Sequence, residues 1–338
     1  MPRWLHRYNW HRPHGSLKAT TPISRLGLTE NNLLRLHIYS VETYLRPAQF
    51  YRLSAGQSTP TELRATSPIS FEDVEVERAF ATSKDGTQIP VNIIHKKGMA
   101  LDGNNPTLLW GYGVSETPFF LGGARRVWFD AGGVFVIANI RGGGEYGETW
   151  HRQGSLTLKQ NCFDDFIAAA EFLIAKGYTS PAKLALRGGS NGGLLMGAVV
   201  TQRPNLARAV VSEVGIYDSV RSELDPNGLF NTTEFGSIKN EEQFRAIYAY
   251  SPYHRVKDGD AYPAMFLTTG ENDGRVNPMH SRKMAARLQA ATGSERPIYL
   301  LVRGDTGHGI GTPLSVRIDE TADYLAFLFD QLGMTIQE

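Results

Sequence analysis

Arg187-Gly188-Gly189-Ser190-Asn191-Gly192-Gly193 is the stretch that decides the fold, and it contains the pattern G-x-S-x-G around Ser190. A short apolar run (residues 183–186) precedes it, and an apolar run compatible with a helix (residues 194–201) follows it. On a turn this tight, side chains two residues before and after the serine would collide, so glycine is needed at both positions. The turn holds the hydroxyl above the end of a strand, beside the positive end of a helix dipole. We therefore interpret Ser190 as a candidate nucleophile.

Strand-like and helix-like segments alternate on both sides of this turn. Strands are expected at residues 91–95, 107–110, 134–138, 209–212, 265–269 and 298–302, and helices at residues 164–176, 279–290 and 316–332. The run VFVIA at residues 134–138 is apolar throughout, as in a strand that is buried on both faces. The alternation predicts an α/β fold with a mostly parallel sheet covered by helices on both faces. Functional groups are then expected at the carboxyl ends of the strands.

An acid and a base follow the serine in the chain. Asp273 and His308 each come just after an expected strand, and the order Ser190, Asp273, His308 is that of an α/β-hydrolase. A serine hydroxyl is a poor nucleophile near neutral pH, so an imidazole must take its proton while a carboxylate fixes the tautomer of the ring. Glu271 and Asp305 are neighbouring carboxylates that remain alternatives for the acid.

Composition excludes several other classes of protein. The 338 residues carry a net charge of +1, which gives no global reason to expect a nucleic-acid partner. Cys162 is the single cysteine, so the chain forms no intrachain disulfide and no thiolate metal cluster. The proposed chemistry needs no cofactor and no metal. Because the sequence shows no long apolar span and no signal-peptide pattern, we expect a cytoplasmic protein without a membrane partner.

Residues 81–333 resemble the catalytic domain of the prolyl oligopeptidase family of serine peptidases. The resemblance is carried by residues 110–113 (WGYG), 139–151 (NIRGGGEYGETWH), 159–166 (KQNCFDDF), 188–195 (GGSNGGLL), 273–276 (DGRV), 278, 280–281 and 307–309 (GHG). It implies that Ser190 is the nucleophile, Asp273 the acid and His308 the base. It also implies an oxyanion hole made of the backbone N–H of Asn191 and the hydroxyl of Tyr112.

The same resemblance implies a pocket for the substrate residue before the scissile bond, called P1. Arg275 matches an arginine that holds a substrate carbonyl. Three positions match apolar walls of the proline pocket: Ile216, Phe235 and Val276. Asn231, however, stands where the family has a tryptophan that stacks on the proline, and Ser115 stands in place of an aromatic residue. Because two flat apolar surfaces are replaced by small polar groups, we expect a broader or shifted P1 preference.

The family places a β-propeller over the active site, and the segment before the catalytic part is too short for one here. We expect residues 38–80 to hold the last propeller strands and a linker, including a hairpin of residues 49–53 and 61–65. Residues 81–338 are expected to form the catalytic domain. Surface that a propeller covers in the family would then face water, so we expect self-association.

Residues 1–37 differ in character from the rest. Residues 8–17 and 21–26 resemble the C-terminal tail of insertion-sequence transposases with an integrase-type core. The segment holds six Lys or Arg residues against one acidic residue, a balance that is typical of nucleic-acid arms and also of loosely ordered chain. We expect a poorly ordered segment, and a DNA-binding module confined to these residues is the less favoured alternative.

The resulting functional hypothesis is a serine peptidase that hydrolyses short peptides, nominally after proline, through an acyl-enzyme. Two alternatives remain open from the sequence. In the first alternative, the chain is a truncated, catalytically impaired remnant of such a peptidase. In the second, it is a broad esterase that uses the same triad.

Overall fold

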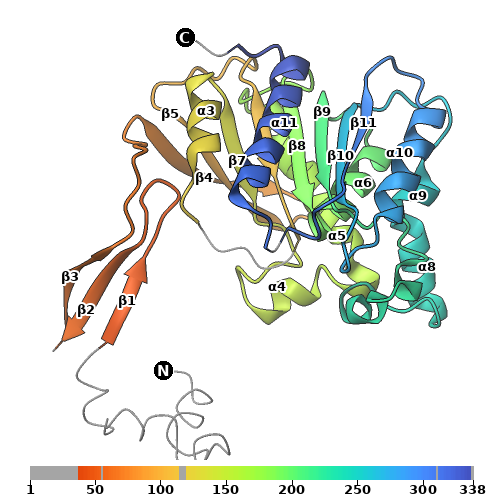
Figure 1. The fold of residues 1–338 in the computed structure, drawn as a ribbon, viewed down its shortest axis with the longest axis horizontal. Coiled ribbons are helices and arrows are strands. Elements are labelled where there is room, and N and C mark those ends of the chain that lie inside the picture. Colours follow the sequence, from red (N-terminus) through yellow and green to blue (C-terminus); the bar gives the residue numbers. More distant parts are fainter. Residues whose placement is uncertain (1–36, 55, 114–118, 310, 336–338) are drawn as a thin grey trace, which may run out of the picture. The chain divides into compact units, whose positions relative to one another are not determined.

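The computed structural model describes residues 37–54, 56–113, 119–309 and 311–335 (Figure 1). The chain divides into two compact units. The described part of the first unit comprises residues up to 70 together with residues 119–121, and the second unit begins at Phe71 and holds the other described residues.

The first unit contains a three-stranded antiparallel sheet in the order β1-β2-β3. Its strands are β1 (His37–Val41), β2 (Gln49–Ser54) and β3 (Gln57–Arg64). The predicted hairpin is confirmed, because β2 pairs with β3 across a turn at which Gly56 adopts a φ of 79°. Strand β1 was not predicted; its Tyr39 stacks on Tyr51 of β2 with ring centroids 5.4 Å apart.

The second unit is built on an eight-stranded sheet in the order β11-β10-β9-β8-β6-β7-β5-β4. The strands are β4 (Val74–Thr82), β5 (Gln88–Lys96), β6 (Thr107–Trp110), β7 (Val134–Ala138), β8 (Leu184–Gly189), β9 (Ala209–Glu213), β10 (Ala264–Gly270) and β11 (Ile298–Arg303). Neighbouring strands run parallel from β11 to β7, whereas β5 is antiparallel to both β7 and β4. The mostly parallel α/β sheet expected from the sequence is therefore confirmed.

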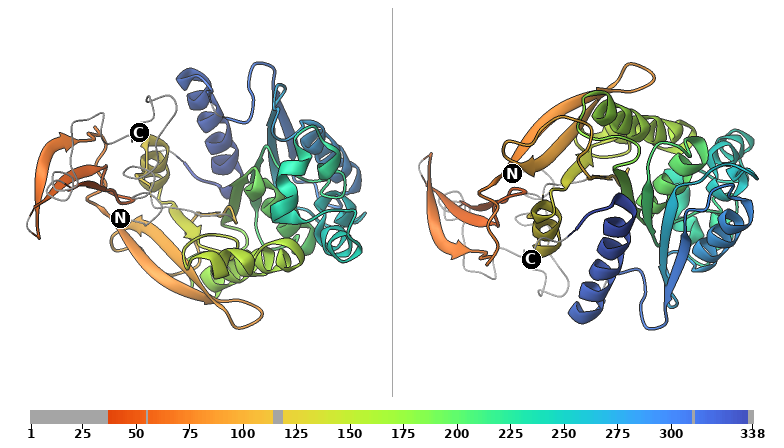
Figure 2. Two further views of the ribbon diagram at one scale, coloured as in Figure 1. Left: turned by 90° about the horizontal axis from the view of Figure 1, so that it is seen from below. Right: turned by 90° about the horizontal axis from the view of Figure 1, so that it is seen from above.

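Helices cover both faces of this sheet. Helices α3 (Gly123–Asp130) and α11 (Leu314–Leu332) lie on one face (Figure 2). Trp128 of α3 contacts Phe329 of α11 there. The other face carries α5 (Gln160–Ala175), α6 (Asn191–Gln202) and α10 (Met279–Ala291). Shorter helices fill the connections: α4 (Glu148–Arg152), α7 (Thr232–Phe235), α8 (Glu241–Tyr250) and α9 (Pro252–Arg255).

The core lies where α5 and α6 pack on the sheet. All five residues of β7 are buried, as the apolar run predicted, and Phe166 and Leu173 on the expected face of α5 are fully buried as well. Full burial of one such side chain contributes roughly 1.5–3 kcal/mol. This packing makes the strand ends rigid supports for the loops that follow them. In the described part of the chain, no helix is long and apolar enough to cross a membrane.

Candidate active site

The G-x-S-x-G turn connects β8 to α6. Ser190 adopts φ 58° and ψ −117°, a sparsely populated conformation with positive φ that costs a non-glycine residue roughly 1–3 kcal/mol. A Cβ atom on Gly188 would lie 2.5 Å from the carbonyl oxygen of Gly192, so the predicted collision across the turn is present. The N–H of Ser190 donates to the carbonyl of Glu213 on the neighbouring strand at 2.8 Å. Sheet and helix therefore hold the serine hydroxyl at the carboxyl end of β8.

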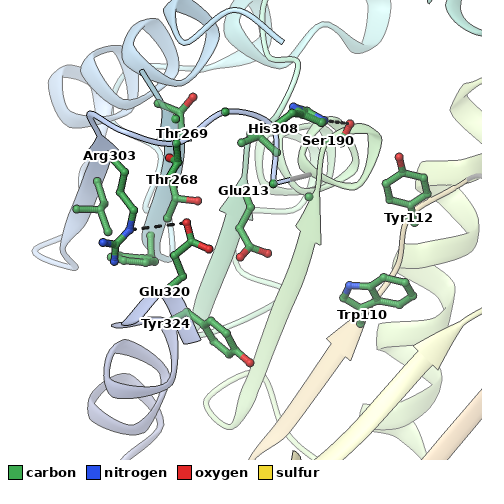
Figure 3. Close-up of a pocket in the computed structure, with 18 residues that line it drawn as sticks. Trp110, Tyr112, Ser190, Glu213, Thr268, Thr269, Arg303, His308, Glu320 and Tyr324 are labelled. Carbon is green, nitrogen blue, oxygen red and sulfur yellow. Dashed lines mark hydrogen bonds and ion pairs between the residues drawn. The ribbon is translucent and has the colours of Figure 1, made fainter. Parts of the chain in front are cut away.

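Ser190, His308 and Asp273 form one chain of hydrogen bonds. Ser190 Oγ lies 2.9 Å from His308 Nε2 (Figure 3), and His308 Nδ1 lies 2.7 Å from Asp273 Oδ2. A neutral imidazole with its proton on Nδ1 donates to the carboxylate and accepts the serine proton at Nε2. The side chain of Asp273 is fully buried, and that of His308 is 15% exposed.

The carboxylate of Asp273 is held in its ionised form. Burial acts to raise its pKa, but hydrogen bonds from His308 and from the backbone N–H groups of Val276 and Arg275 outweigh it, so the pKa lies below the ordinary 3.8. Asp273 therefore carries its charge throughout the neutral pH range. Of the three carboxylates near this point in the sequence, Asp273 is the one that reaches His308, whereas Glu271 is exposed and pairs with Arg282.

The two residues expected to form the oxyanion hole lie against the same turn. Asn191 is the first residue of α6, so its backbone N–H belongs to the helix end that has no intrahelical acceptor. Its side-chain amide donates to the carbonyl of Tyr112 at 2.9 Å, which fixes the loop after β6 against the turn. The ring of Tyr112 lines the same cavity as Ser190 and His308 (Figure 3).

Comparison with known proteins places this arrangement in a family. Residues 122–335 match the model of the prolyl oligopeptidase family. The chain belongs to the prolyl oligopeptidase family. It is 45% identical over 274 residues to a prolyl endopeptidase of Dictyostelium discoideum, covering 78% of this chain and 36% of that protein. It is 39% identical over 302 residues to a prolyl endopeptidase of Elizabethkingia miricola, covering 88% and 43%.

Solved structures agree with the sequence comparison. A post-proline cleaving enzyme from Rickettsia typhi superimposes with a TM-score of 0.81 at 34% identity, covering 88% of this chain and 43% of that one. The chain thus spans less than half the length of these relatives. The α/β-hydrolase fold and the resemblance of the catalytic part are confirmed, and the propeller of the family is absent from the described residues. The transposase-like segment lies outside the described residues.

Two of the residues expected to form the P1 pocket, Arg275 and Val276, belong to the loop that carries Asp273. Ile216, Phe235 and Val276 are buried in the core, and Asn231 is half-buried at the end of a short 3-10 helix (Gly228–Asn231) that leads into α7. Arg275 is exposed, and its guanidinium carbon lies 5.3 Å from the centre of the Phe230 ring. An amide of Asn227 donates to the carbonyl of Gly274, which joins this segment to the Asp273 loop. Ser115 lies outside the described residues.

Sequence reasoning missed a group of residues on the other side of Ser190. A cavity of about 420 Å³ adjoins Ser190 and His308 and is also lined by Glu213, Glu320 and Tyr324 (Figure 3). None of the five expected P1 residues lines it. Glu213 could have been found from the sequence, because it lies at the carboxyl end of β9, the strand next to β8. No sequence signal pointed to Glu320, since its position depends on how α11 packs over the sheet.

Titratable clusters elsewhere offer no metal site. Within the described ranges, no group of three or more His, Cys, Asp or Glu residues is arranged to hold a metal ion. Cys162 is buried, and burial raises the pKa of its thiol to about 11, so it is a poor nucleophile at neutral pH.

Proposed function

We propose that this chain is a serine peptidase that hydrolyses short peptides through an acyl-enzyme. The observation that carries the proposal is the continuous hydrogen-bonded chain from Ser190 through His308 to Asp273, three residues that lie just beyond the carboxyl ends of β8, β11 and β10. Ser190 Oγ attacks the scissile carbonyl while His308 Nε2 takes its proton. The imidazolium then gives that proton to the leaving amine, and water releases the acyl group by the same route in reverse.

Negative charge that develops on the carbonyl oxygen needs donors already in place. The N–H of Asn191 and the hydroxyl of Tyr112 are our candidates, supported by the position of Asn191 at the start of α6 and of Tyr112 beside Ser190. One such donor is typically worth about 3 kcal/mol of transition-state stabilisation. Neither donor requires a cofactor, and the roles of Ser190, Asp273 and His308 require none either.

A substrate panel tests this proposal. The chain is offered short internally quenched peptides, p-nitrophenyl esters of the same acyl groups, and a folded protein substrate. A peptidase cleaves the peptides with measurable kcat/KM, whereas a broad esterase turns over only the activated esters. A catalytically impaired remnant would cleave neither class.

We further propose that the P1 preference is broader than proline. Asn231 is half-buried and presents an amide where an aromatic face would stack on a proline ring, a contact worth roughly 1 kcal/mol beyond burial of area. Asn231→Trp should therefore raise the ratio of kcat/KM for a Pro-P1 peptide over an Ala-P1 peptide by about fivefold. Thr233→Trp, on an exposed neighbouring position, is the matched control and should leave the ratio unchanged. An unaltered ratio in the Asn231 variant would show that this residue does not line the pocket.

We propose that this chain associates with further copies of itself. Among the described residues, no further strand pairs with the outer edges of β1 and β3, and open edges with exposed apolar residues favour pairing with another chain. Ile38→Lys on β1 should lower the apparent mass in light scattering at the same concentration. Ile318→Lys replaces an equally exposed isoleucine on α11 and should not. A monodisperse monomer of the unmodified chain would contradict the proposal.

Residues 1–37 keep the role expected from their composition. We propose that they are a transposase-like addition that takes no part in catalysis, and that nucleic acid is not a partner. A chain that lacks residues 1–35 retains β1 and is the companion sample in the light-scattering experiment. We also propose a cytoplasmic location, which suits a chain with one buried cysteine.

A further inference from the structure

Ser190 stands between two separate regions of the catalytic unit. The ammonium group of Lys159, just before α5, lies 5.3 Å from the centre of the Phe235 ring, which places that P1 wall on the α5 side of the sheet. The cavity of about 420 Å³ lies on the other side, where Glu320 and Tyr324 of α11 face the ends of β9, β10 and β11 (Figure 3). Helices α5 and α11 cover opposite faces of the sheet (Figure 2). The cavity and the wall expected for P1 therefore lie on different sides of Ser190.

Gly189 keeps the mouth of this cavity open. A Cβ atom on Gly188 or on Gly193 would lie 2.5 Å from a backbone atom, so the turn itself requires those glycines. A Cβ atom on Gly189 would meet Glu213 at 3.5 Å, an ordinary van der Waals contact. The fold of the turn does not explain why residue 189 is so small. Its lack of a side chain leaves free space directly beside Ser190.

The chemistry of peptide cleavage indicates which half of the substrate lies on which side of Ser190. The acyl half of the substrate stays on Ser190 with its P1 side chain, while the amine half must lie against His308 in order to receive the proton. His308 and the glycines on either side of it line the cavity. On the basis of the proposed peptidase function, we propose that this cavity binds the substrate residue on the amine side, called P1′, and that Glu213 and Glu320 select a basic P1′ side chain.

The charges and walls of the cavity support a cationic side chain. Apart from His308, its charged lining residues are Glu213, Glu320 and Arg303, so negative charge is in excess. Arg303 is held at 2.5 Å by Asp323, which does not line the cavity, and its Nε atom lies 3.8 Å from Glu320. Trp110 offers a flat surface for the methylene stem of a lysine or arginine, whereas the ring of Tyr324 is buried and is already covered by the guanidinium of Arg187, 3.8 Å from its centre (Figure 3).

The carboxylates of Glu213 and Glu320 differ in how far neighbouring cations already neutralise their charge. Glu213 accepts two hydrogen bonds from Arg187, each of 3.0 Å. Burial raises the pKa of Glu320, and the charge of Glu213 raises it further, although Arg303 opposes the effect. A substrate cation placed between the two carboxylates would relieve this repulsion. Glu320 is thus the side chain whose replacement should change selectivity while leaving the Arg187–Glu213 pair intact.

Peptides that differ only at P1′ test the proposal. The series carries Lys, Met or Glu at P1′ with an identical acyl half, and kcat/KM is measured for the whole chain. We expect Lys to exceed Glu by about 10-fold, and Glu320→Gln to reduce this ratio to about 2-fold. Asp319→Asn removes the same charge from the adjacent, exposed position of α11 and should keep the full ratio.

A second variant tests whether the P1′ side chain needs the free space of the cavity, independently of its charge. The Cβ atom of a valine at position 189 would make only ordinary van der Waals contacts with Glu213. Gly189→Val therefore narrows the cavity, and kcat/KM for a Lys-P1′ peptide should fall about 10-fold relative to a Gly-P1′ peptide. Labelling by a fluorophosphonate, whose leaving group is fluoride, needs no P1′ residue and is measured for every protein.

Absence of labelling in the unmodified chain would overturn the proposed function and the subsite with it. Normal labelling combined with equal cleavage of the Lys and Glu peptides, or with a preference for Glu, would overturn the subsite alone. An equal loss for Lys-P1′ and Gly-P1′ peptides in Gly189→Val would also contradict it.

Discussion

Replacement of Ser190 by alanine should lower kcat for peptide hydrolysis by about 10⁴-fold or more. The hydroxyl is the atom that His308 Nε2 contacts at 2.9 Å, and nothing else at that position can form an acyl-enzyme. Because Ser190 is anchored by its backbone N–H and its carbonyl, the alanine variant should keep the fold. Steady-state hydrolysis of a short peptide measures the effect, and thermal melting provides the control.

Retained hydrolysis in a folded Ser190→Ala protein would show that another group is the nucleophile. Ser281 provides a control substitution, because it is a serine with a buried side chain on α10, away from His308. Ser281→Ala should leave kcat within about twofold, since a small change of this kind removes no group that touches the substrate.

Replacement of Asp273 by asparagine should lower kcat by about 10⁴-fold with little change in KM. The amide can still accept the backbone N–H groups of Arg275 and Val276, so the loop should stay in place. Its NH₂ group, however, would donate to His308 Nδ1 and force the ring proton onto Nε2. The imidazole could then no longer accept the proton of Ser190.

Glu271→Gln is the control for this substitution. It changes the same charge two residues away, at an exposed side chain that pairs with Arg282 rather than with His308. Its activity should stay within about twofold of the unmodified chain. Equal losses in the two variants would mean that the loop as a whole, and not the hydrogen bond to His308, matters for catalysis.

The strands of the parallel part of the sheet and the helices α5, α6, α10 and α11 could be predicted because each of these elements has a strong local pattern. Buried parallel strands such as β7 are continuous apolar runs, and the turn around Ser190 is set by close backbone contacts at Gly188 and Gly192. Asp273 and His308 could be placed for the same reason, because each directly follows a strand of the parallel part of the sheet.

Other features were not predicted, and only some of them depend on more than the local sequence pattern. Helix α8 was missed although Asn240 caps it by accepting the N–H of Gln243 and two glutamates begin it, so a signal was present. Strand β1 has no such signal, since it is specified by pairing with β2. The cavity beside Ser190 combines β9, β11 and α11, and only tertiary packing brings Glu213 and Glu320 together.

Covalent labelling tests the central claim most directly. The whole chain is treated with a fluorophosphonate, its intact mass is measured, and the adduct is located by peptide mapping. The hydrogen-bonded chain of Ser190, His308 and Asp273 predicts one adduct per chain, located on Ser190 within residues 187–193. A folded protein that remains unlabelled, or that carries its adduct on a different residue, would contradict the account.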